Sequence, residues 1–189
     1  KKGTFIETYL PKHELFDNKG YRWPFIKHFR FAPVYTQFGC PYSCSYCASS
    51  LTSVTIRSIE NLKEEIRLIH KTGYKEIHFG DETFGNPKKY IKNLLNWVIK
   101  EEFGLSWSGF TYPGLIDKNF LEVMKLSGCH TLVIGIDNAD FDLLKNYDRH
   151  VKKDRILQFI ADCHELNIDV CGDFILGLEE EDEAAVLKT

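Results

Sequence analysis

The stretch Cys40-Pro41-Tyr42-Ser43-Cys44-Ser45-Tyr46-Cys47 brings three cysteines into eight residues and directly follows a strand-like run, Ala32 to Phe38. Thiolates at such short spacing can converge on one metal centre. Gly39 and Pro41 bend the backbone, so that the sulfur atoms face inward rather than alternating outward. The sequence therefore places the chemistry of the chain in the loop after its first strand.

The loop offers three sulfur ligands, and that number is informative. A 4Fe-4S cluster normally takes four cysteines, so three leave one iron open to a non-protein ligand, just as catalytic zinc keeps an open position. A structural zinc site would need a fourth ligand from Cys129, Cys163, Cys171 or a histidine, and none of these lies in a second paired motif. Those three cysteines are most simply small buried hydrophobic residues. Disulfides fit less well, because six cysteines in 189 residues are sparse for a stapled secreted domain.

The composition argues against several classes of protein. With 43% hydrophobic residues, the 189-residue chain can bury a sizeable core as one domain. A net charge of −3 with dispersed lysines gives no basic stripe, so nothing indicates nucleic-acid binding. No apolar run approaches the ~20 residues that span a bilayer, and the N-terminus does not resemble a signal peptide. We therefore expect a cytoplasmic, reduced protein without a transmembrane segment.

Short apolar runs alternate with amphipathic stretches, which predicts βα units around a parallel sheet. Ser58 and Asp117 are placed to cap helices that Gly73 and Gly128 end, and Pro87 to take the first position of a helix between them. The fold class that follows is α/β, a partial (β/α) TIM-like barrel truncated after about the fifth strand. We expect strands at 32–38, 76–79, 105–109, 131–136 and 168–176, and later helices around 156–166 and from about residue 180.

The same pattern suggests a division of the chain. We expect residues 1–31 to form a linker before the barrel and residues 32–189 to form the barrel core. The chain starts at Lys1 without a methionine and stops at Thr189 inside a helical pattern. We therefore expect it to be a piece of a longer protein, whose C-terminal part covers the barrel edge left exposed after the fifth strand.

Acidic residues and glycines gather after the predicted strands, at the carboxyl ends where (β/α) barrels build their active sites. The second strand leads into Gly80-Asp81-Glu82-Thr83, the fourth into Gly135-Ile136-Asp137-Asn138 and the fifth into Gly177-Leu178-Glu179. Turn formation is the alternative explanation for these acids. Four other strand residues either face the barrel interior or belong to the core, namely Trp107, Tyr112, His78 and Asp173.

Cys40-x3-Cys44-x2-Cys47, with the aromatic Tyr46 before the last cysteine, resembles the motif of the radical S-adenosylmethionine superfamily. From Phe38 onward the later strand ends resemble that family in order and spacing. The branch that often carries an upstream cobalamin-binding domain is the most similar, and the residues that carry this resemblance are Cys40-Pro41-Tyr42, Asp81-Glu82-x-Phe84, Gly135-Ile136-Asp137, Phe174-Ile175-Leu176-Gly177-Leu178 and a linker-like segment from Leu10 to Pro24.

The resemblance implies an enzyme. Cys40, Cys44 and Cys47 would bind a 4Fe-4S cluster whose open iron chelates S-adenosylmethionine, and reductive cleavage would give a 5′-deoxyadenosyl radical that activates a substrate C–H bond. The implied reactions are cobalamin-dependent methyl transfer and ring or carbon–carbon bond formation, with any cobalamin bound by a domain outside this chain. The implied partners are an organic substrate and an electron donor such as flavodoxin or ferredoxin.

The resemblance also implies roles for single residues. Tyr46 falls where the family contacts adenine, Asp81 and Glu82 where it receives the methionine amino group, and Asp137 where it binds ribose. Arg149 could pair with the carboxylate of the cofactor, and the alternative is a solvated charged face of the basic stretch around it. No side chain is assigned as catalytic.

Two departures from the family pattern affect the cofactor contacts. The fifth-strand motif usually continues with Pro-Gly-Glu, whereas here Gly177-Leu178 runs into three glutamates. The fourth-strand position that often reads Glu-Ser is here Asp137-Asn138. The competing hypothesis is a non-catalytic iron-sulfur or zinc module for structure or electron transfer, which has no use for carboxylates at neighbouring strand ends.

Overall fold

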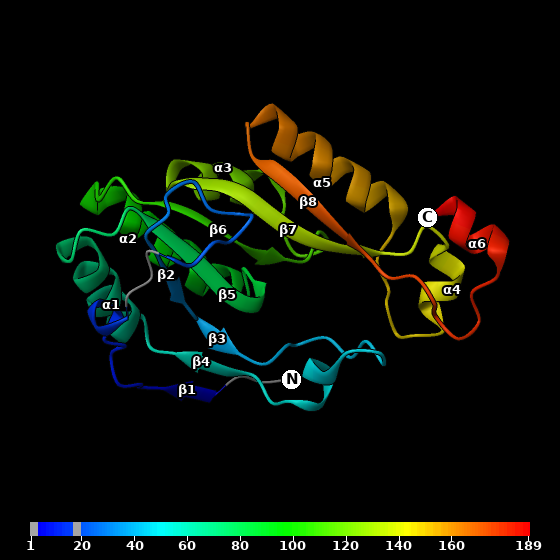
Figure 1. The fold of residues 1–189 in the computed structure, drawn as a ribbon, viewed down its shortest axis with the longest axis horizontal. Helices are drawn as coiled ribbons and strands as arrows, with labels where there is room; N and C mark the ends of the chain where they lie inside the picture. The colour runs from blue at the N-terminus through cyan, green and yellow to red at the C-terminus, as the bar shows by residue number, and fades with distance from the viewer. Residues whose placement is uncertain (1–3, 17–19) are drawn as a thin grey trace.

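A computed structural model describes residues 4–16 and 20–189 of the chain. Its centre is a five-stranded sheet in the order β2-β5-β6-β7-β8, in which every neighbouring pair is parallel. The predicted α/β fold with a partial barrel is confirmed, and within the described residues the sheet has two ends and does not close (Figure 1). Its strands are β2 (Phe31–Val34), β5 (Glu76–Phe84), β6 (Ser106–Thr111), β7 (Cys129–Asp137) and β8 (Asp169–Phe174).

Four long helices connect these strands and pack their apolar faces against the sheet (Figure 1). They are α1 (Ile59–Lys71), α2 (Lys88–Glu101), α3 (Lys118–Leu126) and α5 (Lys153–Glu165). Two short helices, α4 (Phe141–Lys145) and α6 (Glu183–Lys188), lie near the C-terminal end. The core is one continuous cluster between sheet and helices, as expected for βα units.

The helix boundaries follow the signals in the sequence. The Ser58 side chain accepts a hydrogen bond from the Asn61 backbone N–H, and the Asp117 side chain accepts one from the Phe120 backbone N–H. Gly73 and Gly128 follow their helices with φ of 82° and 103°. The prediction for Pro87 was wrong by one position, because it is the extended residue before α2 rather than the first helical one.

A second, three-stranded sheet was not predicted. It has the order β1-β4-β3, with β1 (Thr4–Ile6) parallel and β3 (Gln37–Phe38) antiparallel to β4 (Thr55–Arg57). The expected strand at 32–38 is therefore wrong as one element, since β2 ends at Val34 and β3 belongs to the other sheet. Strands β5 and β7 run further than expected, whereas β8 is shorter.

The predicted linker, residues 1–31, includes 1–3 and 17–19, which lie outside the described residues. Its described part is joined to the rest of the chain: β1 pairs with β4 in the small sheet, and Tyr74 donates a hydrogen bond to the His13 carbonyl at 2.9 Å. The boundary between residues 31 and 32 stays a prediction. No helix in the described part of the chain combines the length and the apolar character that a membrane crossing requires.

Candidate active site at the carboxyl ends of the strands

A cavity of about 450 Å³ lies where the cysteine loop meets the carboxyl ends of β5, β6, β7 and β8. Every residue that the sequence singled out for a metal or cofactor lines it, and these are Cys40, Cys44, Cys47, Tyr46, Asp81, Glu82, Asp137 and Arg149. Further lining comes from residues that the sequence did not assign to the site, Tyr42, Ser49, Thr83, Phe110 and Thr111. The topology thus gathers residues from six chain segments at one place, because Arg149 comes from the connection between α4 and α5.

The three cysteines of the loop are reduced and half-buried. Backbone bonds hold the loop, with Ser45 N–H donating to the Tyr147 carbonyl and Cys47 N–H to the Cys44 carbonyl, each at 3.0 Å. The Cys40 Sγ atom lies 3.5 Å from Thr83 Oγ1 at the end of β5. The loop is therefore tied to both β5 and the α4 region.

The arrangement of donors bears on which metal could be held. Within residues 4–16 and 20–189, no three His, Cys, Asp or Glu side chains stand close enough to hold a single ion. The thiols instead border an open volume, which fits a multi-iron cluster because such a cluster is wider than one ion. Cys129 and Cys163, considered as fourth zinc ligands, are buried in the hydrophobic core. The soft thiolate set and the space beside it fit a 4Fe-4S cluster.

Asp81 is fully buried, and neighbouring groups occupy both of its carboxylate oxygens. Oδ1 accepts from the Thr36 and Gln37 backbone N–H groups at 2.6 and 3.3 Å, and Oδ2 accepts from the Thr36 hydroxyl. Burial raises the pKa of Asp81 to about 7, although the hydrogen bonds from Thr36 oppose this shift. Glu82, the next residue, is exposed and faces the same cavity. The adjacent acids therefore differ in what they can contact.

Asp137 and Arg149 form a buried charge pair, with Arg149 Nε 2.6 Å from Asp137 Oδ2. Neither of these two atoms has a hydrogen-bond partner of acceptable geometry among the described residues, so their contact is an ion pair only. Arg149 Nη2 donates to the Gly135 carbonyl at 2.6 Å. Burial opposes the charge of Arg149, but the neighbouring Asp137 carboxylate raises its pKa overall. The alternative of a solvated charged face is therefore wrong for Arg149.

The backbone at Asp137 is unusual. Its φ of 67° lies in the left-handed region, and it interrupts the register between β7 and β8. A non-glycine residue in this conformation at a cavity is a known mark of functional sites. The conformation brings the carboxylate back over Gly135, where an added Cβ would meet Asp137 Oδ1 at 2.8 Å.

Three tyrosine rings line the cavity beside the charge pair. The Tyr42 and Tyr112 centroids are 4.4 Å apart, and the Arg149 guanidinium lies 4.7 Å from the Tyr112 centroid. Burial raises the pKa of Tyr42 to about 12, and burial together with the Asp137 charge raises the pKa of Tyr46. These phenols are thus protonated at neutral pH and can donate hydrogen bonds.

For four residues in or just after the predicted strands, the sequence left open whether they face the barrel interior or belong to the core. Two of them line the cavity and two do not. Tyr112 and Asp173 line the cavity, whereas Trp107 is part of the hydrophobic core. His78 is also buried, within 2.9 Å of the Ser108 hydroxyl, and burial lowers its pKa to about 4. His78 is therefore neutral, and it does not line the cavity.

Comparison with known proteins gives a family. The model of the Radical SAM superfamily matches residues 34–189. An uncharacterised methyltransferase of Pyrococcus horikoshii is 27% identical over 187 residues, which cover 97% of this chain and 40% of the relative. Bacteriochlorophyllide d C-12(1)-methyltransferase of Chlorobaculum tepidum is 25% identical over 173 residues, 86% of this chain and 37% of the relative. The chain thus spans less than half the length of these relatives.

Solved structures share the fold. TsrM of Kitasatospora setae, a radical S-adenosylmethionine methyltransferase with cobalamin and a 4Fe-4S cluster bound, superposes with a TM-score of 0.76 at 20% identity. The match covers 82% of this chain and 33% of that one. The cobalamin-dependent enzyme OxsB with aqua-cobalamin bound gives a TM-score of 0.73 at 17% identity, over 82% of this chain and 25% of the other.

Proposed function

Since the chain belongs to the Radical SAM superfamily, we propose that it binds a 4Fe-4S cluster and S-adenosylmethionine and acts as a radical enzyme on an organic substrate. The observation that carries this proposal is the convergence of three free thiols, an exposed carboxylate and a buried charge pair on one cavity. A non-catalytic iron-sulfur or zinc module would not need the polar groups of that cavity.

Each cavity residue then has a role. Cys40, Cys44 and Cys47 would hold the cluster, and the reduced cluster would supply the one electron that cleaves S-adenosylmethionine into methionine and the 5′-deoxyadenosyl radical. Glu82 accepts the methionine ammonium, because its carboxylate is exposed to the cavity whereas both oxygens of Asp81 are already engaged. Asp81 instead positions residues 36 and 37 ahead of the cysteine loop.

The charge pair and the tyrosine complete the cofactor site. The Asp137 carboxylate lines the cavity, and a carboxylate can accept hydrogen bonds from ribose hydroxyls. Arg149 faces the cofactor carboxylate, and Tyr46 contacts the adenine beside the last cysteine. All three residues line the cavity, which supports these assignments.

The reaction class follows from the relatives. Proteins named as methyltransferases are similar to this chain over most of its length, which supports methyl transfer to an organic substrate. The cobalamin in the similar TsrM structure supports a cobalamin-dependent reaction here, with the cobalamin bound by a domain outside these residues. We further propose that an electron donor such as flavodoxin or ferredoxin serves the protein and that it works in the cytoplasm. We also keep the division of the chain into a linker at 1–31 and a barrel core at 32–189 as part of this proposal.

The first test is anaerobic reconstitution with iron and sulfide, followed by electron paramagnetic resonance of the reduced protein with and without S-adenosylmethionine. We expect a reduced-cluster signal that shifts when S-adenosylmethionine is added, because the cofactor would bind the open iron. A protein that takes up no cluster and retains zinc would instead be a structural module.

The cysteine assignment predicts a contrast between two variants. Cys44→Ala should abolish cluster binding, because it removes a thiolate from the loop, whereas Cys163→Ala removes only a core thiol. Iron and acid-labile sulfide per folded protein, measured after reconstitution, should fall to background in the first variant alone. Equal iron content in both variants would disprove the assignment.

The carboxyl end of β5 allows a second comparison between variants. Glu82→Ala combined with Asp81→Ala should weaken S-adenosylmethionine binding while the iron content stays unchanged, and Glu82→Ala alone should give most of that loss. Removing one ammonium–carboxylate contact should reduce affinity about tenfold or more. Glu101→Ala, at an exposed position of α2, is the matched control. Equilibrium dialysis of the cluster-loaded proteins measures the affinity, and unchanged affinity in the double variant would show that this strand end is not the amine site.

A further inference from the structure

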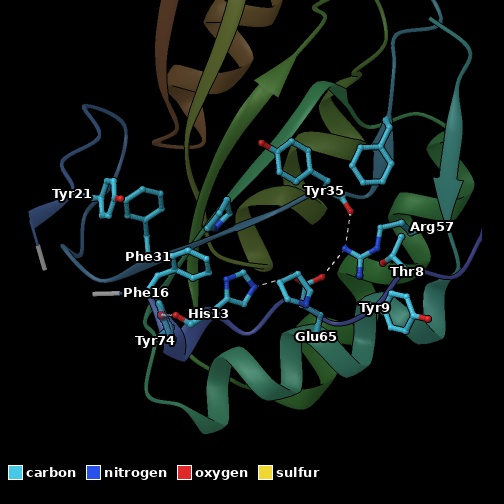
Figure 2. A pocket seen from close by; sticks show the side chains of 13 residues that line it. Thr8, Tyr9, His13, Phe16, Tyr21, Phe31, Tyr35, Arg57, Glu65 and Tyr74 are labelled. Atoms are coloured by element: carbon cyan, nitrogen blue, oxygen red, sulfur yellow. Dashed lines mark hydrogen bonds and ion pairs between the residues drawn. The ribbon is translucent and has the colours of Figure 1, made fainter. Parts of the chain in front are cut away.

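A second cavity, of about 500 Å³, lies along the free edge of β2 (Figure 2). We call it the aromatic pocket, because rings and prolines make up most of its wall. Tyr9, Phe16 and Tyr21 are largely exposed at its border. The ring and proline residues that line it are Tyr9, Pro11, Phe16, Tyr21, Phe31, Pro33, Tyr35, Phe38 and Tyr74.

The floor of the aromatic pocket is a closed polar network. Figure 2 shows His13, Glu65 and Arg57 joined in sequence, with His13 Nε2 2.9 Å from Glu65 Oε1 and Arg57 Nη1 2.6 Å from Glu65 Oε2. Glu65 is the one carboxylate among the lining residues, and both of its oxygens are engaged. The described lining therefore offers no free anionic group to a cationic ligand.

One guanidinium stands beside the pocket. The Arg30 guanidinium lies 4.4 Å from the centroid of Tyr74, whose ring lines the pocket. An anionic group would thus find complementary charge here, and a guanidinium suits a carboxylate or sulfonate especially well.

The volume of the pocket and the proline on the edge strand β2 further limit the kind of ligand that could bind there. A volume of about 500 Å³ is in the range of small-molecule sites rather than of a docked helix. Pro33 lies in β2, which pairs with β5 alone among the described strands, and a proline on an edge strand cannot donate to an added strand. Aromatic walls favour a ligand with flat rings that can stack or meet them edge-on.

We propose that the aromatic pocket binds a small organic anion with a flat apolar body, its acidic group beside Arg30 and its rings against Phe16, Tyr21 and Tyr35. This site is distinct from the cysteine cavity and does not depend on the function proposed above. It adjoins that cavity through Tyr35, because a Cβ on Gly80 of the cysteine cavity would meet the Tyr35 ring at 2.7 Å.

The test is a fluorescence titration of the full-length, cofactor-loaded protein with 8-anilino-1-naphthalenesulfonate. We expect saturable binding of one probe, displaced by 1-naphthalenesulfonate and not by the cationic 1-naphthylmethylammonium. Arg30→Glu should weaken binding about tenfold or more, because it removes an attraction and adds a repulsion. Lys100→Glu, the same charge change on exposed α2, should leave binding unchanged.

A second pair of variants tests the location. Phe16→Ala removes a wall ring that is 70% exposed, and Phe29→Ala removes one that is 66% exposed but does not line the pocket, so folding should survive both. Only Phe16→Ala should weaken the binding of the probe. The proposal is overturned if binding is not saturable, if the cationic compound competes equally, if each variant matches its control, or if another part of the full-length protein covers the pocket and excludes the probe.

Discussion

Asp81 lies in β5 and Asp137 is the last residue of β7, and their surroundings give the two acids different properties. Asp81 is surrounded by uncharged donors from residues 36 and 37 and has a pKa raised to about 7 by burial. Asp137 faces the Arg149 guanidinium in a left-handed backbone conformation. One acid is therefore a structural group whose charge burial opposes, and the other forms an ion pair beside the cavity.

The raised pKa of Asp81 predicts a pH-dependent stability. The folded pKa of about 7 lies above the 3.8 that is ordinary for an aspartate, so the folded state binds the proton more tightly. This contribution to stability is fully present below the unfolded pKa and is lost as pH rises through the folded pKa. From pH 6 to 8.5 the free energy of unfolding should fall by about 1 kcal/mol more in the native protein than in Asp81→Asn.

Urea denaturation of both proteins at the two pH values measures this difference. Asn can still accept from the Thr36 backbone N–H, so the variant should fold. Asp142→Asn on α4, whose carboxylate is exposed, is the control and should keep the native pH dependence. A native-like slope in Asp81→Asn would mean that this carboxyl is ionised across the whole range.

The candidate site was predictable from the sequence as far as local motifs go. The spacing of the cysteines, the order of the strand ends and the family resemblance identified eight residues that line the cavity, but not Tyr42, Ser49, Thr83, Phe110 and Thr111. The bond between Asp81 and Thr36 joins residues 45 positions apart, and no pattern announces it. The burial of Arg149 was missed because its neighbours His150 and Lys152 are indeed exposed, and charge patterning alone cannot separate them.

Helices show how strongly local signals act at the scale of elements. The caps at Ser58 and Asp117 were readable because one side chain satisfies one orphan N–H within three residues. Strands β1, β3 and β4 span only two or three residues each, too few to display a period of two, so the second sheet was invisible in the sequence.

Helix α5 begins differently, and this predicts a stabilising change. Its N-cap residue Lys152 has extended backbone but makes no side-chain capping bond. Lys152→Asp should raise the free energy of unfolding by about 1 kcal/mol, because the new carboxylate can accept from the first-turn N–H groups and interacts favourably with the helix dipole. Ser58→Ala at α1 should lower it by about the same amount.

Thermal or urea unfolding of the cluster-free and cluster-loaded proteins measures both changes. Lys145→Asp, an exposed position near the end of α4, changes the charge equally without offering a cap. If this control stabilised the protein as much as Lys152→Asp, the effect would be one of net charge rather than of capping.

The two sheets of the molecule meet at the segment before the cysteines. The chain leaves the five-stranded sheet at Val34, and Arg57 of β4 then holds it by donating to the Tyr35 and Thr36 carbonyls. Gly39 follows with φ of 77°, so the cysteine loop starts from the small sheet rather than from the barrel. The small sheet thereby positions the loop over the barrel, a role that a single long first strand could not have had.

This division predicts that the loop can be disturbed without unfolding the barrel. A Cβ at Gly39 would lie 2.4 Å from the Ser53 carbonyl oxygen and 2.8 Å from Thr52 Oγ1, and the left-handed backbone is itself costly for alanine. Gly39→Ala should therefore displace the loop and sharply lower iron content, while the main unfolding transition shifts by only a few degrees.

Gly104→Ala, with φ of 63° and nothing within 4 Å, carries similar backbone strain without the clash and should keep its iron. Iron analysis and calorimetry on the same samples separate the two effects: if iron and the unfolding transition are lost together in Gly39→Ala, the loop and the barrel form one cooperative unit, and the small sheet does not act as a separate support.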